Sequence, residues 1–288
     1  MSSRKNLNGV LAVLVVYERN LVQVKSWNQL CELLKYNNND GLSLCHVLVY
    51  DNSAQPLAKP SVLDKCSYIH NPKNEGTASA YTYGMHLAQD LGLDWLLLLD
   101  HDTTLPKSFF SLASDALNQS GKRPAALLPW VVHGERPVSP ANITWSGGFK
   151  PVLRHSGLKL SKSLTGISSA SFIDIRSFWE IGPIPKQLWL DYVDHWIFSR
   201  FNSMNKSIVV FDAVVEHELS IYEPASINSG RLFNIMNAEN FFVTSLPWTA
   251  RFFYPLRILF RIVRQLLSNP AGAWNIVAWL FKPRKNHS

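Results

Sequence analysis

The sequence predicts an α/β protein with a mostly parallel sheet flanked by helices, and two observations support this prediction. Short apolar runs, many of them rich in β-branched residues, alternate along the chain with longer amphipathic segments, which is the pattern of repeated βαβ units. The longest of these runs carry no charged side chain, as expected for strands that helices cover on both faces. We expect strands at residues 9–16, 46–50, 67–70, 95–99, 125–128, 171–175 and 207–211.

Helices are expected between these strands, and a tail follows them. The predicted helices are residues 21–36, 77–91, 107–118 and 190–202. Residues 133–163 are rich in Pro, Gly and Ser, which favours loops or a β excursion that can fold over a substrate. We therefore predict one α/β domain over residues 1–222 and a basic, helical appendage over residues 223–288.

Composition narrows the class of protein and of partner. The chain has 288 residues, of which 47% are hydrophobic and 17% charged, which is typical of a globular protein with a substantial core. Its formal net charge of +7 indicates an anionic partner, such as a sugar nucleotide, a membrane surface or a nucleic acid. Nucleic acid ranks last, because no zinc-finger, RNA-recognition or basic-zipper pattern is present.

The cysteines and the N-terminal apolar run indicate a cytoplasmic protein. Cys31, Cys45 and Cys66 are odd in number and widely spaced, which fits neither a disulfide framework nor a zinc site. The apolar run at residues 9–16 has no cleavage site after it, so a buried strand is preferred to a signal peptide. No apolar stretch reaches the roughly 18 residues needed to span a bilayer.

The tail suggests contact with a membrane surface. Arg257, Arg261 and Arg264 are four and three residues apart, so they share one helix face. Such a helix can lie in a membrane interface with its arginines toward anionic headgroups, which would place the protein at the inner face of the cell membrane. The alternative is a helix docked on the domain with an exposed basic face. The apolar run 274–281, followed by basic residues, repeats the pattern.

Polar side chains follow several predicted strands at the point where each strand ends. Asp51, Asn71 and Asp100 all occupy such positions. In parallel α/β sheets, ligands bind beyond the carboxyl ends of the strands. The sequence therefore predicts that these side chains gather at one edge of the sheet.

Asp100 and Asp102 are the strongest candidates for chemistry. Two carboxylates two residues apart at a strand end can bind a divalent cation, which can neutralise a diphosphate; a simple capping turn is the structural alternative. Residues 100–104 also match the D-x-D-x-T pattern of haloacid-dehalogenase-type phosphatases, in which the first Asp is the nucleophile. That motif normally follows the first strand, whereas here three predicted strands precede it, so the phosphatase remains the second hypothesis.

Longer blocks around these residues resemble family 2 glycosyltransferases of the GT-A fold, in particular bacterial rhamnosyltransferases of polysaccharide assembly. The resemblance covers roughly residues 9–245. Its blocks are VVY at 15–17, VYDNS at 49–53, NPKNEGTA at 71–78, LLDHDT at 98–103, TGISSASFI at 165–173, LWLDYVDHW at 188–196 and EH at 216–217. Ala170 and Ser220 stand where the family carries Gly, and residues 228–240 lack an arginine of the family pattern.

The resemblance implies a role for each block. The donor nucleotide would contact Tyr17, Asp51 and Asn52 in the first two blocks, and its ribose and phosphates would contact Asn71, Asn74, Gly76, Thr77 and Asp100. Gly76 and Thr77 open a predicted helix, where N–H groups can meet a phosphate or merely be capped.

The resemblance also implies a metal site and a catalytic base. Asp100, Asp102 and His217 would hold Mn²⁺ or Mg²⁺, with a neutral imidazole as one ligand, whereas His101 is treated as a spacer or donor contact. Asp191 and Asp194 are three residues apart, so on a helix they share a face. Asp191 is the preferred base toward an acceptor hydroxyl, and Asp194 is the reserve; a pair of helix N-terminal carboxylates is the structural alternative.

The function implied is an inverting transfer of a sugar, most plausibly rhamnose from dTDP-rhamnose and next a sugar from a UDP donor. The acceptor would be a lipid-linked or lipopolysaccharide-type glycan. A non-catalytic membrane-binding module is a further alternative. A Rossmann dehydrogenase is disfavoured because no G-x-G-x-x-G follows the first strand.

Overall fold

The computed structural model describes residues 8–35, 41–57, 64–154, 159–161, 164–217 and 229–281. The chain divides into two compact units, of which the first comprises Met1–Asn142 and Pro151–Glu218 and the second Ile143–Lys150 and Leu219–Ser288. The boundary expected at residue 222 lies outside the described residues. The short segment Ile143–Lys150, which we expected among the loops of the α/β domain, groups with the C-terminal helices.

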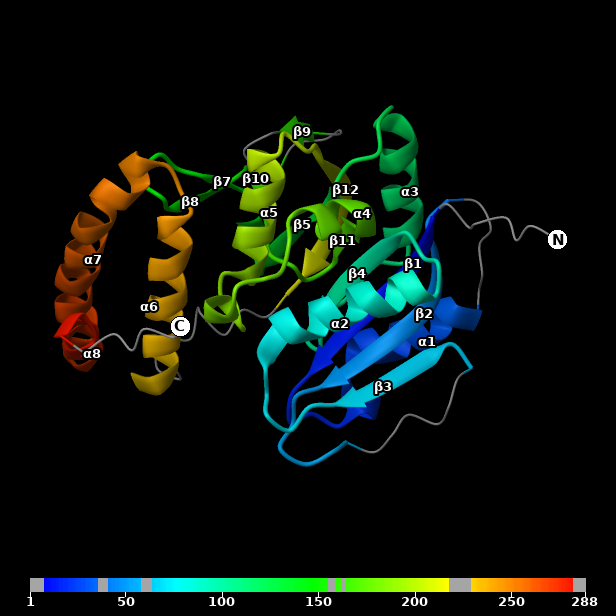
Figure 1. Cartoon of the computed structure of the whole chain (residues 1–288), viewed down its shortest axis with the longest axis horizontal. Helices are drawn as coiled ribbons and strands as arrows, with labels where there is room; N and C mark the ends of the chain where they lie inside the picture. The colour runs from blue at the N-terminus through cyan, green and yellow to red at the C-terminus, as the bar shows by residue number, and fades with distance from the viewer. Residues whose placement is uncertain are drawn as a thin grey trace. The chain divides into compact units, whose positions relative to one another are not determined.

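The first unit is built on a nine-stranded mixed sheet (Figure 1). Its strand order is β3-β2-β1-β4-β11-β5-β12-β9, with β6 paired to β5, and a separate three-stranded sheet has the order β10-β7-β8. The strands are β1 (Gly9–Val16), β2 (Ser43–Asp51), β3 (Cys66–His70), β4 (Trp95–Asp100), β5 (Ala126–His133), β6 (Arg136–Ser139), β7 (Ala141–Ile143), β8 (Phe149–Pro151), β9 (Lys159–Ser161), β10 (Leu164–Thr165), β11 (Ser171–Asp174) and β12 (Ile208–Glu216).

Most strands of the large sheet run in one direction. Strands β3, β2, β1 and β4 are parallel neighbours, and β5 and β12 form a second parallel pair. Because β11 is antiparallel to both β4 and β5, the two parallel blocks point the same way. The carboxyl ends of β1, β2, β4 and β12 therefore lie along one edge, as the sequence predicted.

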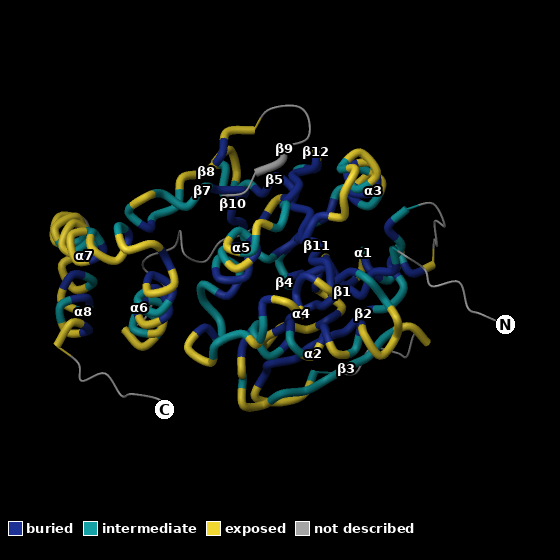
Figure 2. Tube along the Cα trace, turned by 45° about the horizontal axis from the view of Figure 1, so that its top comes forward, coloured by how far each residue is buried: buried dark blue, intermediate teal, exposed yellow. Residues whose placement is uncertain are grey.

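Helices cover both faces of this sheet (Figure 1). Alternate residues of β1 (Val10, Ala12 and Leu14) share a core with α1 (Lys25–Lys35) and α3 (Phe109–Gln119). The other face carries α2 (Gly76–Asp90), where a side chain on Gly84 would come within 2.4 Å of Val13 Cγ2. All eight residues of β1 are buried, and Figure 2 shows the central strands buried, which explains why this strand is apolar throughout rather than alternating.

The remaining elements of the first unit are shorter. They are the 3₁₀ turns η1 (Leu21–Gln23) and η2 (Lys186–Leu188) and the helices α4 (Ile175–Glu180) and α5 (Val193–Ser203). We expected α5 to begin near residue 190, but it begins at Val193. Tyr192 has a φ of 62°, in the left-handed region that a right-handed helix excludes, so Asp191 lies before the helix. The expectation that Asp191 and Asp194 share a helix face is therefore wrong.

The second unit is helical. Its helices are α6 (Ser229–Thr244), α7 (Trp248–Ser268) and α8 (Pro270–Phe281). They enclose a small core of Met236, Val243, Tyr254, Ile258, Ile276 and Trp279. Among the described residues, no helix combines the length and apolar character that crossing a membrane requires.

The arginines of α7 do not all point outward, as we expected them to. The carboxylate of Glu239 is buried, with only 1% of its side chain exposed, and it accepts hydrogen bonds from Arg261 Nη1 at 2.6 Å and Nη2 at 2.9 Å and from Arg257 Nη2 at 3.2 Å. Arg257 also donates to the carbonyl of Ser146. The expectation that this basic face points outward is therefore wrong for Arg257 and Arg261, which bind the buried Glu239, whereas Arg264 is exposed.

Candidate functional site

The carboxyl ends of β4 and β12 bring three potential metal ligands together. Asp100 ends β4, and Asp102 follows in the turn; His217 comes directly after β12. Strand pairing between Thr104 and Glu216 joins the turn after β4 to the end of β12. The sheet thus juxtaposes residues more than 100 positions apart in the sequence.

These three residues form a compact cluster. One ligand atom from each of Asp100, Asp102 and His217 lies within 4.8 Å of the others. His217 Nδ1 is 3.2 Å from Asp102 Oδ1, and His217 Nε2 is 3.9 Å from Asp100 Oδ2. Atoms that bind one cation at about 2.0–2.3 Å are roughly 3–4.5 Å apart. The observed spacing therefore fits a single divalent cation.

The electrostatics of the cluster also favour a cation. Burial, together with the nearby carboxylates of Asp102 and Asp194 and against the opposing effect of His217, raises the pKa of Asp100 to about 6. Burial lowers the pKa of His217, but Asp102, Asp100 and Asp194 outweigh burial and raise it. Burial raises the pKa of Asp102, but the adjacent His217 dominates and lowers it. Three acids around one imidazole leave excess negative charge for a cation to neutralise.

One buried oxygen in the cluster has the imidazole as its close polar neighbour. Asp102 Oδ1 lies 3.2 Å from His217 Nδ1 and forms no other hydrogen bond among the described residues, and a carboxylate oxygen with two lone pairs keeps the capacity to bind a cation. Two carboxylate oxygens and an imidazole nitrogen suit Mn²⁺, whereas Mg²⁺ prefers oxygen ligands throughout. The residues present therefore fit a divalent metal.

Two hydroxyl residues that we did not predict support this cluster. Thr103 Oγ1 lies 3.4 Å from His217 Nδ1 and forms a short hydrogen bond with Ser169 Oγ. Ser169 Oγ also accepts a hydrogen bond from the main-chain N–H of Asp100. Such outer contacts orient metal ligands. Their only signal in the sequence was that both residues lie inside the blocks 98–103 and 165–173.

Asp194 lies near the cluster, and the two predicted base candidates have different surroundings. Asp194 influences the pKa values of both Asp100 and His217. Its Oδ1 accepts from the N–H of His195 at 2.7 Å, and its Oδ2 accepts from the N–H of Ser168 at 3.3 Å. Asp191 precedes the helix and is half-buried. Asp194 thus both anchors main chain and lies beside the metal-ligand cluster, and the expectation that Asp191 is the base stays a prediction.

The N-terminus of α2 has partners that the sequence did not predict. The carbonyl of Trp189 accepts a hydrogen bond from the N–H of Ala78, and the carbonyl of Leu190 accepts from Thr77 Oγ1. Gly76 has a φ of 74°, and a Cβ there would lie 2.1 Å from the Trp189 carbonyl. Main-chain carbonyls therefore engage the Ala78 N–H and the Thr77 hydroxyl at this helix end, and the expected contacts of the Gly76 and Thr77 N–H groups with a phosphate stay predictions. Gly76 is required because a side chain would displace the segment that carries Asp191.

Asp51 lies at the end of β2 and is fully buried. Its Oδ1 accepts from the N–H of Ser53 at 2.9 Å, and its Oδ2 accepts from the N–H of Leu57 at 2.9 Å and from the hydroxyl of Tyr68 at 2.6 Å. Burial raises the pKa of Asp51, but these hydrogen bonds prevail and lower it. Asp51 thus shapes the turn after β2, and its expected contact with a nucleotide base stays a prediction.

The other predicted donor residues lie at the same edge. Asn52 Nδ2 donates to the carbonyl of Gly76, while its buried Oδ1 has no hydrogen-bond partner among the described residues. Asn71 Nδ2 lies within hydrogen-bond distance of the Tyr50 hydroxyl and of Glu75. Asn74 has a φ of 49°, and Tyr17 is 47% exposed just beyond β1. The sheet brings these residues to the edge that carries Asp51, and their contacts with a nucleotide stay predictions.

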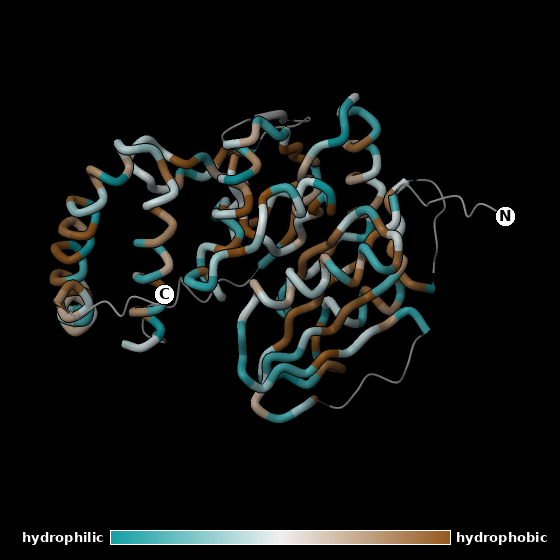
Figure 3. Tube along the Cα trace, viewed as in Figure 1, coloured by the Kyte–Doolittle hydropathy of each residue, from teal (hydrophilic) through white to brown (hydrophobic). Residues whose placement is uncertain are grey.

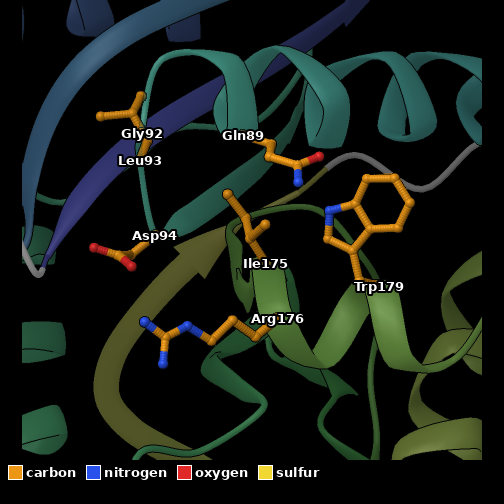
Figure 4. Close-up of a pocket in the computed structure, with 7 residues that line it drawn as sticks. All are labelled: Gln89, Gly92, Leu93, Asp94, Ile175, Arg176 and Trp179. Atoms are coloured by element: carbon orange, nitrogen blue, oxygen red, sulfur yellow. The ribbon is translucent and has the colours of Figure 1, made fainter.

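A separate pocket of about 220 Å³ lies at the opposite edge of the sheet (Figure 4). It is lined by Gln89, Gly92, Leu93, Asp94, Ile175, Arg176 and Trp179. Asp94 precedes β4, whereas Asp100 ends it, so the strand separates this pocket from the metal-ligand cluster. None of the predicted catalytic, donor-binding or metal-binding residues lines this pocket.

Comparisons with known proteins agree with this geometry. No protein-family model matches the chain. The dTDP-rhamnosyl transferase RfbF of Shigella flexneri is 26% identical over 202 residues, which are 68% of this chain and 64% of that protein. The chain thus aligns with less than two thirds of the length of this curated relative.

Solved structures show the same fold. GalNAc-T7 with UDP, GalNAc and Mn²⁺ has a TM-score of 0.56 at 14% identity, covering 81% of this chain and 47% of that one. S. aureus TarS 1–349 has a TM-score of 0.53 at 11% identity, covering 94% and 80%. Both are GT-A glycosyltransferases. The predicted GT-A fold and the predicted resemblance to rhamnosyltransferases are therefore confirmed.

Proposed function

We propose that the chain is a metal-dependent glycosyltransferase that uses a nucleotide-sugar donor. The observation that carries the proposal is the Asp100, Asp102 and His217 cluster, whose ligand atoms lie within 4.8 Å of one another at the ligand-binding edge of a GT-A sheet. The relative RfbF, named as a dTDP-rhamnosyl transferase, supports the same reaction class.

Asp100, Asp102 and His217 would hold the cation, with Mn²⁺ preferred and Mg²⁺ second. When bound, the cation supplies positive charge that stabilises the diphosphate of the leaving nucleotide. Thr103 and Ser169 keep the ligands in place. Asp51 holds the turn after β2 through Ser53 and Leu57, which positions the wall against which the nucleotide base would lie.

Asp191 is the proposed general base. An acceptor hydroxyl oxygen would attack the anomeric carbon of the donor sugar as the bond from that carbon to the diphosphate oxygen breaks. Asp191 would take the hydroxyl proton, and the nucleoside diphosphate would leave on the opposite face of the sugar. Configuration at the anomeric carbon would invert. Asp194 would position the start of α5 rather than accept the proton.

The donor and acceptor follow from the resemblance. We propose dTDP-rhamnose as the donor, with a UDP-sugar second, and a lipid-linked or lipopolysaccharide-type glycan as the acceptor. The net charge of +7 favours both an anionic donor and an acceptor embedded in an anionic membrane. We therefore propose that the chain works at the inner face of the cell membrane.

Thermal-shift measurements with dTDP, UDP and GDP, each with and without Mn²⁺, test the donor and metal together. We expect one nucleotide to raise the melting temperature only when Mn²⁺ is present, because a ligand stabilises the state that binds it. Asp102→Ala should abolish the shift, whereas Asp115→Asn, which changes an exposed carboxylate on α3, should not. Absence of a shift with every nucleotide would contradict the proposal.

The phosphatase hypothesis makes a different prediction for the same acids. A phosphatase would hydrolyse p-nitrophenyl phosphate and lose that activity in Asp100→Asn, because Asp100 would be its nucleophile. We expect no such hydrolysis by the unmodified chain. Sustained turnover that disappears in Asp100→Asn would replace the transferase proposal with the phosphatase.

A further inference from the structure

Helix α7 carries apolar side chains on the side opposite its own core. Tyr254 and Ile258 are buried against α6 and α8 in the core of the second unit. A different set of α7 residues, here named the outer stripe, is at least 50% exposed. The outer stripe consists of Phe252, Leu256, Leu259, Phe260, Val263 and Leu267.

The outer stripe is continuous along the helix. At about 100° per residue, its members fall within an arc of roughly 100° that is centred well away from Tyr254 and Ile258. Leu267 is 87% exposed and Phe260 is 69% exposed, and hydrophobic residues recur along α7 (Figure 3). Single exposed apolar residues are ordinary, but a contiguous apolar stripe marks an interaction surface.

Helix α8 likewise carries apolar side chains on both its buried and its exposed face. Ala273, Ile276 and Trp279 are buried toward the unit's core. Trp274 and Phe281, seven residues apart and therefore on one helix face, are 68% and 82% exposed. Two successive helices thus expose large apolar side chains while their opposite faces make the core.

The charged residues after position 239 are all cationic. After Glu239 the sequence contains no further Asp or Glu. Its cationic residues are Arg251, Arg257, Arg261, Arg264, Lys282, Arg284 and Lys285. Arg264 is exposed, and at about 100° per residue it lies roughly 40° beyond one border of the outer stripe. An apolar strip with a cation beside it, in a segment without acids, matches the layers of an anionic bilayer surface.

We infer that the outer stripe of α7 and the exposed aromatic residues of α8 seat the second unit on an anionic lipid surface. The apolar side chains enter the headgroup–acyl boundary, and Arg264 reaches the phosphates beside them. A second copy of the chain fits this face poorly, because it would bring two sets of cations together with no acid on either. The inference deepens the proposed function by naming where a lipid-linked acceptor is met, and only that link rests on the proposed function.

Sedimentation of the full chain with vesicles tests this directly. We expect binding to vesicles of phosphatidylethanolamine and phosphatidylglycerol and much weaker binding to phosphatidylcholine alone. The triple variant Phe252→Ser, Leu259→Ser, Phe260→Ser should lower the partition coefficient at least about tenfold, because three apolar side chains no longer leave water. Arg264→Gln should lower it about fivefold, with a weaker dependence on salt.

The matched control is Leu153→Ser, which removes an apolar side chain that is 79% exposed in the first unit. This control should bind vesicles as the unmodified chain does, and all variants should melt at the same temperature, because the altered residues lie outside the core. Failure of the unmodified chain to sediment, equal binding to neutral vesicles, or unchanged binding by the triple variant would each overturn the inference. So would a dimer that the triple variant dissociates in the absence of vesicle binding.

Two further measurements separate this inference from the proposed function. Asp102→Ala should still bind vesicles, and the triple variant should keep its nucleotide-dependent and Mn²⁺-dependent thermal shift. Loss of vesicle binding with an intact shift therefore rejects the membrane surface alone. Loss of the shift with intact vesicle binding rejects the transferase alone.

Discussion

Each unit of the molecule contains an acidic centre, and the two centres differ in burial and in how their charge is compensated. In the second unit, Glu239 is buried and held by hydrogen bonds from two arginines, and both of its oxygens have partners. In the first unit, the side chains of Asp100 and Asp102 are 30% and 25% exposed and share one imidazole, that of His217. An acid with full compensation supports structure, whereas two acids that share one imidazole leave a place for a cation.

Replacing an acid should therefore have unequal consequences in the two units. Removal of Asp102 loses its contact with His217, which lowers the Asp102 pKa, but relieves the repulsion that raises the pKa of Asp100, so the ligand-free protein should lose little stability. Removal of the charge on Glu239 leaves two cations without their partner, so the second unit should lose stability. Four predictions, from the largest expected effect to the smallest, examine this difference.

The first is Asp102→Ala. We expect kcat/KM for sugar transfer to fall roughly 10³-fold, the upper end of the loss when one electrostatic stabiliser of a transition state is removed. The melting temperature without ligand should change little, because the lost contact with His217 opposes the relieved repulsion with Asp100. An assay of sugar transfer from the nucleotide donor measures the fall in kcat/KM. A melting curve without ligand measures the change in stability. A large fall in the melting temperature would show that Asp102 is a structural acid, as Glu239 is.

The second compares Asp191→Asn with Asp194→Asn. We expect Asp191→Asn to lower kcat about 10²-fold to 10³-fold, within the usual range for a general base, while the nucleotide-dependent thermal shift remains. Asp194→Asn weakens the hydrogen bonds to Ser168 and His195, so it should lower the melting temperature as well as the rate. The opposite pattern would make Asp194 the base.

The placement of Asp191 shows what the sequence could not provide. The sequence located the block at residues 188–196, and the spacing of Asp191 and Asp194 suggested one helix face. The left-handed conformation of Tyr192 separates them, and the carbonyls of Trp189 and Leu190, just before it, contact the start of α2. Contacts between segments 113 residues apart leave no periodic signal in either segment.

The strands, by contrast, were predictable because their signal is local. The predicted strand at residues 9–16 coincides with β1, and the predicted strands at 67–70 and 95–99 differ from β3 and β4 by one residue. Burial on both faces requires apolar residues throughout, and the polar residues that follow must then lie at the sheet edge. The positions of the α7 arginine side chains were harder to predict. Their spacing identifies a shared helix face but does not indicate whether that face points inward to Glu239 or outward.

The third prediction is Glu239→Gln. Breaking a buried ion pair costs about 3–5 kcal/mol, and since Arg257 and Arg261 are 24% and 33% exposed, we expect about 2–3 kcal/mol here. Hydrogen exchange of the α6 and α7 amides at increasing denaturant concentration measures the free energy of unfolding of this unit. The thermal shift with nucleotide and Mn²⁺ should be unaffected, because the second unit holds none of the proposed ligands.

Glu180→Gln is the matched control for that prediction. Glu180 forms an ion pair with Lys206 at 2.6 Å, but its side chain is 47% exposed. Solvent weakens such a pair, so the same substitution should cost no more than about 0.5 kcal/mol. Equal effects of Glu180→Gln and Glu239→Gln would show that burial does not distinguish the two acids.

The fourth and smallest prediction is Tyr68→Phe, which removes the 2.6 Å hydrogen bond to Asp51 Oδ2. We expect a loss of about 1–2 kcal/mol near neutral pH, since hydrogen bonds to charged groups contribute about that much.

Despite burial, the hydrogen bonds from Ser53, Tyr68 and Leu57 hold the pKa of Asp51 below its ordinary 3.8. The stability they provide is therefore fully present above the unfolded pKa and is lost as the pH falls through the folded one. The difference in unfolding free energy between Tyr68→Phe and the unmodified chain should accordingly be constant from pH 5 to pH 7, a range chosen to lie above both pKa values, and should shrink below about pH 4. A difference that stays constant in acid would mean that the Tyr68 hydroxyl acts through its weaker contact with the Leu57 carbonyl at 3.4 Å and not through the charge of Asp51.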